Sequence, residues 1–183
     1  MRLFLAIELS ESARRHLIKV QDVLRPIVRG VSFTRPENLH LTLKFLGEVP
    51  DNNVKPLCDS LEAMAPCGAV ELMADQLTCF PERGAIRIIG AGMQVPASLG
   101  QLVSQIETTC KEHGFRLEGR PYTAHITLAR AKDVLPPAMR KTLGEATASL
   151  WPGPEVLAEE FVLMQSQLKR EGAVYTPAAH FVI

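Results

Sequence analysis

The stretches His40-Leu41-Thr42-Leu43 and His125-Ile126-Thr127-Leu128 repeat one pattern, His-x-Thr-Leu, at positions 85 residues apart. Both stretches lie in short runs rich in leucine, isoleucine and threonine, which predicts β-strands. Because side chains alternate between the two faces of a strand, each histidine and its threonine point to the same face. Each stretch therefore presents an imidazole and a hydroxyl side by side.

Two such strands facing each other would bring two imidazoles to one cleft. Histidine titrates near neutral pH, so one imidazole can accept a proton while the other donates one. The pattern thus indicates His40 and His125 as candidates for acid–base catalysis, with Thr42 and Thr127 beside them. The alternative is that the histidines are half-exposed strand residues without chemistry and that threonine is present as a good strand former.

The predicted elements around the two motifs also repeat. In the first half, hydrophobic periodicity predicts strands and helices in the order β-α-β-α-β over residues 3–7, 10–28, 37–47, 52–65 and 70–78. In the second half, the same order is predicted over residues 86–89, 98–113, 122–129, 137–149 and 157–165. Residues 173–182 form a closing strand that could pair with either sheet. We therefore expect a single domain over residues 1–183, with an internal repeat over roughly 1–80 and 84–167.

Composition narrows the class of protein. The 183 residues are 46% hydrophobic, and 20 basic residues balance 20 acidic ones, which argues against a long electrostatic track on nucleic acid but not against an RNA end. The first apolar run is cut by Glu8, and no stretch approaches the roughly 20 apolar residues that a membrane span needs. The four cysteines form no C-x-x-C pair. We expect a cytoplasmic monomer that does not associate with membranes.

The sequence offers no recognisable site for a metal ion or a cofactor. The two motif histidines do not form a helical H-E-x-x-H pair, and neither motif brings carboxylates at ligand spacing. The segment 84–92 carries three glycines, but not in the order of a dinucleotide-binding loop. We therefore expect that the protein uses no metal and no cofactor.

The two motifs belong to a wider set of five recognisable segments, at residues 2–7, 36–49, 122–130, 165–168 and 172–175. Together they resemble the 2H phosphoesterases, which are named for two His-x-Thr/Ser motifs, and in particular the RNA 2′,3′-cyclic phosphodiesterases, also described as 2′-5′ RNA ligases. Two positions depart from that family's pattern. Ala124 stands where proline is frequent, and Phe33 stands where an aromatic residue, often tryptophan, is common.

The resemblance implies an α+β fold with two pseudo-symmetric lobes, each an antiparallel-type sheet with helices on its outer side, around a central cleft that carries both motifs. It implies that the substrate is RNA with a 2′,3′-cyclic phosphate end, which the enzyme hydrolyses to a 2′-phosphomonoester. His40 would donate a proton to the leaving 3′ oxygen, and His125 would accept one from water. The reverse reaction would form a 2′-5′ linkage.

The resemblance also implies that Thr42, Thr127 and Arg130 bind the phosphate. Arg130 has the opposite strand parity from His125, so a strand end or a bulge would be needed to turn it into the cleft. The alternative is that Arg130 forms a plain ion pair on the surface. Lys44 is expected on the same face as Thr42, where it would add a positive charge on one side only. Either Tyr175 or Phe33 could stack on a base or pack in the core; their residue types alone do not decide.

Two other functions fit the same residues. One is a phosphodiesterase for a small cyclic phosphate nucleotide, and the other is a non-catalytic module that binds RNA ends. A pure binding module has no need of two imidazoles, which favours an enzyme.

Overall fold

The computed structural model describes residues 1–170 and 172–183, and its elements follow the predicted order. The strands are β1 (Arg2–Glu8), β2 (Val31–Phe33), β3 (His40–Glu48), β4 (Val70–Leu72), β5 (Ala74–Phe80), β6 (Ile86–Met93), β7 (His125–Leu135), β8 (Val156–Ala158), β9 (Glu160–Lys169) and β10 (Gly172–Val182). The helices are α1 (Glu11–Leu24), α2 (Asp51–Glu62), α3 (Ala97–Glu112) and α4 (Met139–Thr147).

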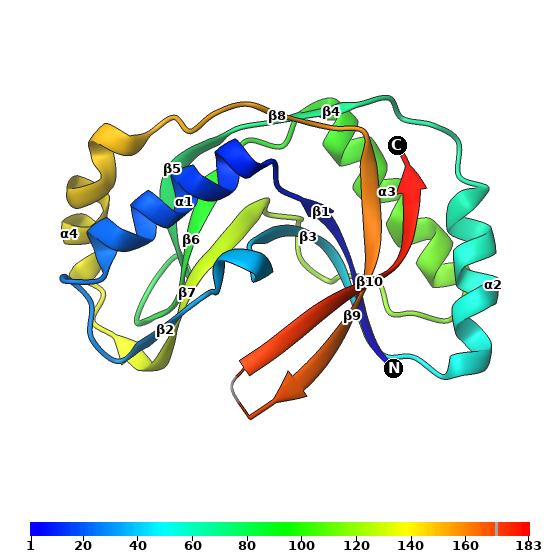
Figure 1. Cartoon of the computed structure of the whole chain (residues 1–183), viewed down its shortest axis with the longest axis horizontal. Coiled ribbons are helices and arrows are strands. Elements are labelled where there is room, and N and C mark those ends of the chain that lie inside the picture. Colours follow the sequence, from blue (N-terminus) through cyan, green and yellow to red (C-terminus); the bar gives the residue numbers. More distant parts are fainter. Residues whose placement is uncertain (171) are drawn as a thin grey trace.

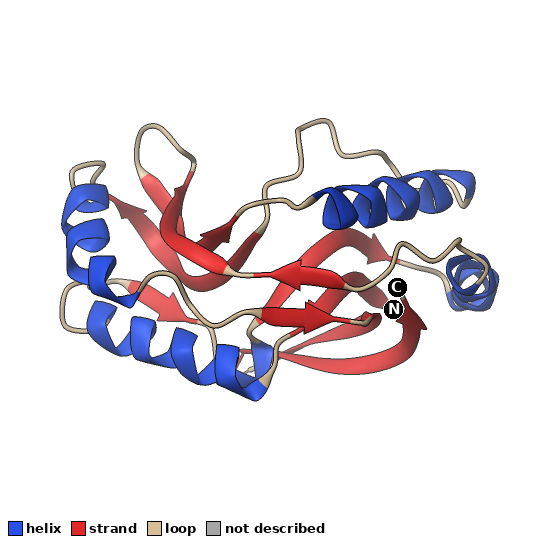
Figure 2. Cartoon of the chain, turned by 90° about the horizontal axis from the view of Figure 1, so that it is seen from above, coloured by secondary structure: helices blue, strands red, loops and turns tan. Residues whose placement is uncertain are grey.

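The strands form an antiparallel sheet in the order β10-β9-β1-β3-β7-β6-β5, with β2 also paired to β7. Strands β4 and β8 form a separate two-stranded ladder. The first lobe consists of β1, β3, β9 and β10 with α2 and α3, and the second lobe consists of β2, β5, β6 and β7 with α1 and α4 (Figure 1). Figure 2 shows the helices along the periphery of the strands. The predicted α+β fold with two lobes is confirmed, and the two half-sheets are joined where β3 pairs with β7.

The two sequence repeats exchange elements between the lobes. Strand β5 ends the first repeat but pairs with β6, and strand β9 ends the second repeat but pairs with β1. Helix α1 likewise leaves the first repeat and packs against α4 and β7 (Figure 1). Each lobe is therefore built from both halves of the chain.

Several element boundaries differ from the prediction, and three of these differences have a visible structural basis. The strand predicted over residues 70–78 is divided at Met73, because β4 pairs with β8 whereas β5 pairs with β6. The second motif strand begins at His125 and runs to Leu135, later than the predicted 122–129. Helix α1 ends at Leu24, earlier than predicted. The prediction ran too far because Val28, which lies beyond the turn that follows the helix, is buried and so extends the apolar pattern.

Helix α1 supports the second motif strand from behind. Its N-cap is Ser10, whose Oγ accepts a hydrogen bond from the Ala13 amide at 3.3 Å. The buried amide of Gln21 donates to the carbonyl oxygens of Thr34 and Leu128, at 2.8 and 2.9 Å. Because Leu128 directly follows Thr127, this contact fixes β7 next to its motif.

Candidate active site

The pairing of β3 with β7 brings the two motifs together. Leu41 pairs with Ile126 in antiparallel register, and both side chains are buried. One residue to either side of this pair, the register places His40 toward Thr127, and Thr42 toward His125. Since neighbours along a strand alternate in direction, these four side chains share the sheet face opposite the buried pair.

Both imidazoles are oriented in the same way. The Nδ1 atom of His40 lies 2.8 Å from the carbonyl oxygen of Asn38, and that of His125 lies 2.9 Å from the carbonyl oxygen of Thr123. A carbonyl oxygen only accepts, so Nδ1 is the donor in both rings and Nε2 is the atom free to exchange a proton. In His40 that atom lies 3.0 Å from Thr42 Oγ1.

Two residues that the sequence analysis missed hold these carbonyl groups. Asn38 Nδ2 donates to the Ala173 carbonyl on β10 at 2.8 Å. The hydroxyl of Tyr122 donates to the Thr42 carbonyl on β3 at 2.8 Å, which ties the segment before the second motif to the first motif strand. The repeat carried a signal for these roles, because in both halves the carbonyl that orients the imidazole belongs to the residue two positions before the histidine.

Aromatic side chains pack on both imidazoles. The ring of His40 lies 4.9 Å from that of Phe4 and 5.3 Å from that of Tyr175, and the ring of His125 lies 4.5 Å from that of Phe80. Of the two aromatic residues considered at the sequence level, Tyr175 thus packs beside the first histidine. The other, Phe33, packs against the core beneath the guanidinium of Arg25, 4.5 Å from its ring centre.

Burial lowers the pKa of His40 below its ordinary value, because the imidazolium loses hydration. The hydrogen bond to the Asn38 carbonyl opposes this effect, and the positive charges of Arg130 and His125 add to it. Arg130 and His125 therefore lie within electrostatic reach of His40.

A bulge after each threonine decides which side chain follows it into the cleft. In β3 the partners are Ala6 for Thr42 and Leu5 for Lys44, and in β7 the partners are Gly90 for Thr127 and Ile89 for Ala129. The residue skipped in each ladder is the motif leucine, Leu43 or Leu128. The parity of each strand reverses there, so the following residue turns away from the cleft and the one after it, Arg130 in β7, returns to it.

The same bulge contradicts the expectation for Lys44. Its side chain is buried on the helix side of β3, where Nζ lies 2.7 Å from Glu107 Oε1 and 3.0 Å from the Arg116 carbonyl oxygen. The expectation that Lys44 shares the face of Thr42 was wrong, because it assumed an unbroken strand period.

Two glycines of β6 leave room beside the motifs. Gly90 pairs with Thr127, and Gly92 pairs with His125. A Cβ atom at Gly90 would lie 3.1 Å from the Ile126 carbonyl oxygen and 3.4 Å from His125 Cδ2. These glycines therefore keep the face next to the second motif open, a role that the sequence pattern did not reveal.

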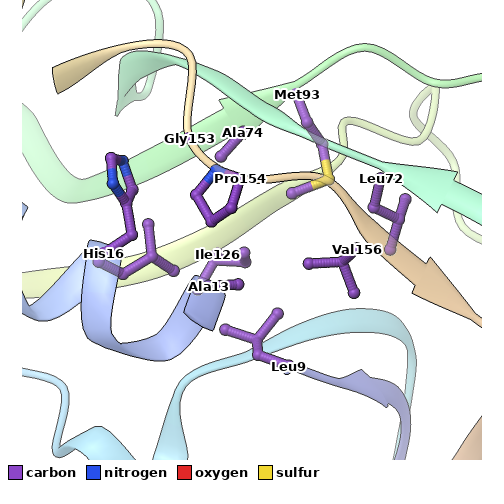
Figure 3. Close-up of a pocket in the computed structure, with 11 residues that line it drawn as sticks. Leu9, Ala13, His16, Leu72, Ala74, Met93, Ile126, Gly153, Pro154 and Val156 are labelled. Carbon is purple, nitrogen blue, oxygen red and sulfur yellow. The ribbon is translucent and has the colours of Figure 1, made fainter. Parts of the chain in front are cut away.

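A cavity of about 440 Å³ opens beside the motifs, and its lining includes Thr42, Phe45, Tyr122 and His125. A much smaller apolar cavity, of about 20 Å³, lies where α1 and the chain before β8 meet the strands, with Ile126 in its lining (Figure 3). Ile126 faces away from His125, so of these two cavities only the larger one adjoins the motif face that carries Thr42 and His125.

Among the described residues, Glu8, Glu160 and His180 form the group whose potential metal-ligand atoms lie within 4.8 Å of one another. All three are exposed, and none belongs to either motif. The expectation of a metal-free protein stays a prediction. In the part of the chain that the structure describes, no helix is long and apolar enough to cross a membrane.

The comparisons with known proteins agree with this arrangement. The model of the LigT-like phosphoesterase family matches residues 7–90 and again residues 92–175. A protein of Methanothermobacter thermautotrophicus named RNA 2′,3′-cyclic phosphodiesterase is 32% identical, over 96% of this chain and 95% of its own length. The structure of TT0787 of Thermus thermophilus superposes with a TM-score of 0.82 at 29% identity, over 100% and 97% of the chains. Escherichia coli LigT complexed with 3′-AMP gives a TM-score of 0.78 at 27% identity, with the same coverage.

Proposed function

We propose that this chain, which belongs to the LigT-like phosphoesterase family, hydrolyses the 2′,3′-cyclic phosphate at an RNA end to a 2′-phosphomonoester. The observation that carries the proposal is the pair of histidines on adjacent strands, each with Nδ1 fixed by a carbonyl and Nε2 left to exchange a proton. The Methanothermobacter thermautotrophicus relative is named for the same class of substrate, an RNA 2′,3′-cyclic phosphate, and the 2′-phosphate product is the proposal's own. The complex of Escherichia coli LigT with 3′-AMP supports a nucleotide as the ligand of this fold.

In the proposed reaction, His125 Nε2 takes a proton from water as the water oxygen attacks phosphorus. The bond between phosphorus and the 3′ oxygen breaks, and protonated His40 gives its Nε2 proton to that oxygen. Thr42 and Thr127 donate hydrogen bonds to the non-bridging oxygens, and Arg130 stabilises their charge. If the 5′-hydroxyl of a second RNA attacks phosphorus in place of water and the 3′ oxygen again leaves, the same site forms a 2′-5′ linkage.

The electrostatics of the site fit a substrate that carries negative charge. In the free protein the pKa of His40 is lowered by burial and, further, by the nearby positive charges. A bound phosphate would oppose the effect of Arg130 and favour the protonated form of His40 that the acid step needs. We further infer that residues 1–183 act as one domain, because each lobe contains strands of both repeats. That the protein is a cytoplasmic monomer without a metal ion stays a prediction.

The test uses an oligonucleotide with a defined 2′,3′-cyclic phosphate end, and the product is read by phosphorus NMR against 2′- and 3′-phosphate standards. We expect a 2′-phosphate, and we expect His40→Ala and His125→Ala each to lower kcat by at least about 100-fold. The double variant should be little worse than either single one, because the two residues act together. The control is His113→Ala, since His113 contacts Ser60 on the helices of the first lobe instead of the motifs.

Three results would count against the proposal. A predominant 3′-phosphate would reverse the roles of the histidines, and nearly full activity in either single variant would refute the two-histidine mechanism. Loss of activity in a chelator, with rescue by a divalent ion, would refute the metal-free reaction.

A further inference from the structure

The internal repeat places Phe45 in the position that Arg130 holds in the second half. Each residue lies five positions after its motif histidine, and each follows a bulge at the motif leucine. Both therefore point to the cleft face, but one wall of the cleft carries a guanidinium and the other an aromatic ring. The two walls are thus suited to different parts of one ligand.

The side chain of Phe45 is unusually open for a phenylalanine in a strand. It is 61% exposed, and its ring lies 6.0 Å from the ring of Phe4, which packs on His40. A water-exposed aromatic face close to a catalytic imidazole can be covered by a planar ligand group. Nucleobases are such groups, and they commonly stack on aromatic side chains in RNA-binding proteins.

The cavity beside the motifs has the size and lining for a nucleoside. Its volume is about 440 Å³, and Thr42, His125 and Phe45 all line it. Small-molecule sites usually measure roughly 300–1,000 Å³ and combine an apolar lining with a few polar groups. A cyclic phosphate at the histidines would leave the base within the part of the cavity that Phe45 lines.

The wall opposite β3 is anchored to it. Leu117 and Arg120 line this wall, and Leu117 is 46% exposed. Glu107 accepts from Lys44 Nζ and, at 3.3 Å, from the amide of Glu118, so the segment next to Leu117 is fixed to β3. An exposed leucine and the planar guanidinium of Arg120 therefore face the space beside Phe45, and both can contact the flat face of a base.

We propose that Phe45 is the stacking platform for the base of the nucleotide that carries the cyclic phosphate, and that the cavity beside it binds that nucleoside. This inference rests on the proposed function. Stacking uses the face of a base, which every base presents, so it requires a base without selecting one. The enzyme then accepts adenosine and uridine 2′,3′-cyclic phosphates alike and discriminates against a ribose cyclic phosphate that has no base.

The experiment measures kcat and KM for adenosine and uridine 2′,3′-cyclic phosphates and for methyl riboside 2,3-cyclic phosphate. In the wild type, we expect KM to be roughly 10-fold higher without a base. Phe45→Ala should raise KM for both nucleotides roughly 10-fold and leave kcat and the base-free substrate unchanged, and Phe45→Trp should restore KM. The matched control is Leu157→Ala, which removes a side chain of similar exposure, 58%, from β8 outside the cleft.

Calorimetry with adenosine 2′-phosphate and methyl riboside 2-phosphate separates this inference from the proposed function. If Phe45→Ala weakens binding of the adenosine compound alone, the platform is supported. This holds even if the enzyme turns over no substrate, because absence of turnover would overturn the proposed function only. If Phe45→Ala leaves both affinities unchanged or weakens both equally, while thermal unfolding shows the variant to be folded, the platform is refuted.

Discussion

Replacing Lys44 by methionine should destabilise the protein without removing a catalytic group. The side chain is 1% exposed and contacts Glu107, which is 18% exposed, and the Arg116 carbonyl. Removing one member of a buried ion pair typically costs about 3–5 kcal/mol of the free energy of unfolding. Because Glu107 is partly hydrated and keeps the Glu118 amide, we expect the low end, about 3 kcal/mol. For a chain of this length, that lowers Tm by roughly 6–12 °C.

The measurement is urea denaturation followed by circular dichroism, with kcat recorded at a temperature where the variant is folded. The matched control is Lys55→Met, whose Nζ lies 2.8 Å from Asp59, since these two side chains are 82% and 63% exposed. Water screens an exposed pair, so this control should change the free energy of unfolding little. The double variant Lys44→Met/Glu107→Gln should lose less free energy of unfolding than the sum of the two single variants, because each single change leaves the other group of the pair without its partner.

Two results would refute this reasoning. A loss below about 1 kcal/mol in Lys44→Met would show that the buried pair is not the anchor that its geometry indicates. A fall in kcat of about 100-fold in the folded variant would show that Lys44 takes part in catalysis.

Since burial lowers the pKa of His40 below 6.5, the unfolded chain takes up the proton first, and the free energy of unfolding should fall as pH drops below 6.5. For the same reason, the alkaline limb of kcat/KM should lie below pH 6.5, and a limb near pH 8 would contradict the acid role. Tyr122→Phe removes a donor from a β3 carbonyl, so denaturant titration should show a loss of about 1 kcal/mol, whereas no loss would mean that water replaces the hydroxyl. Gly153→Ala would place Cβ 3.0 Å from His16 Cδ2 (Figure 3), and thermal unfolding should show about 1–3 kcal/mol of destabilisation. Gly144→Ala is its control, since no atom apart from its chain neighbours and the backbone of its own helix lies within 4 Å of that Cβ.

The sequence predicted the elements that depend on local pattern. Hydrophobic periodicity placed the strands and helices, and the closing strand β10 was recognised. The twin motifs indicated His40 and His125 because their spacing matches the repeat. These features depend on residues close together in the chain, which is why a reading of the sequence reaches them.

The features that were missed depend on pairing between distant strands. The bulge at Leu43 can be seen only in the register with β1, and it reverses the direction of Lys44 relative to the prediction. The bulge at Leu128, considered for Arg130 from its strand parity, is located only by the register with β6. The exchange of β5 and β9 between lobes leaves no periodic trace in either strand. Side-chain support such as that from Tyr122 likewise appears only once the strands are paired.

The exchange of last strands between the repeats bears on how the chain is made and how it arose. Leu5 pairs with Leu163, so β1 gains this partner only after the long stretch of chain between the two strands has been synthesised. Such long-range pairing favours slow folding, and until then β1 presents an unpaired edge that invites aggregation. Two identical half-length chains could pair in the same way, each lending its last strand to the other. The present arrangement is therefore what we expect from the fusion of a two-fold symmetric dimer, with the two His-x-Thr motifs meeting at the former symmetry axis.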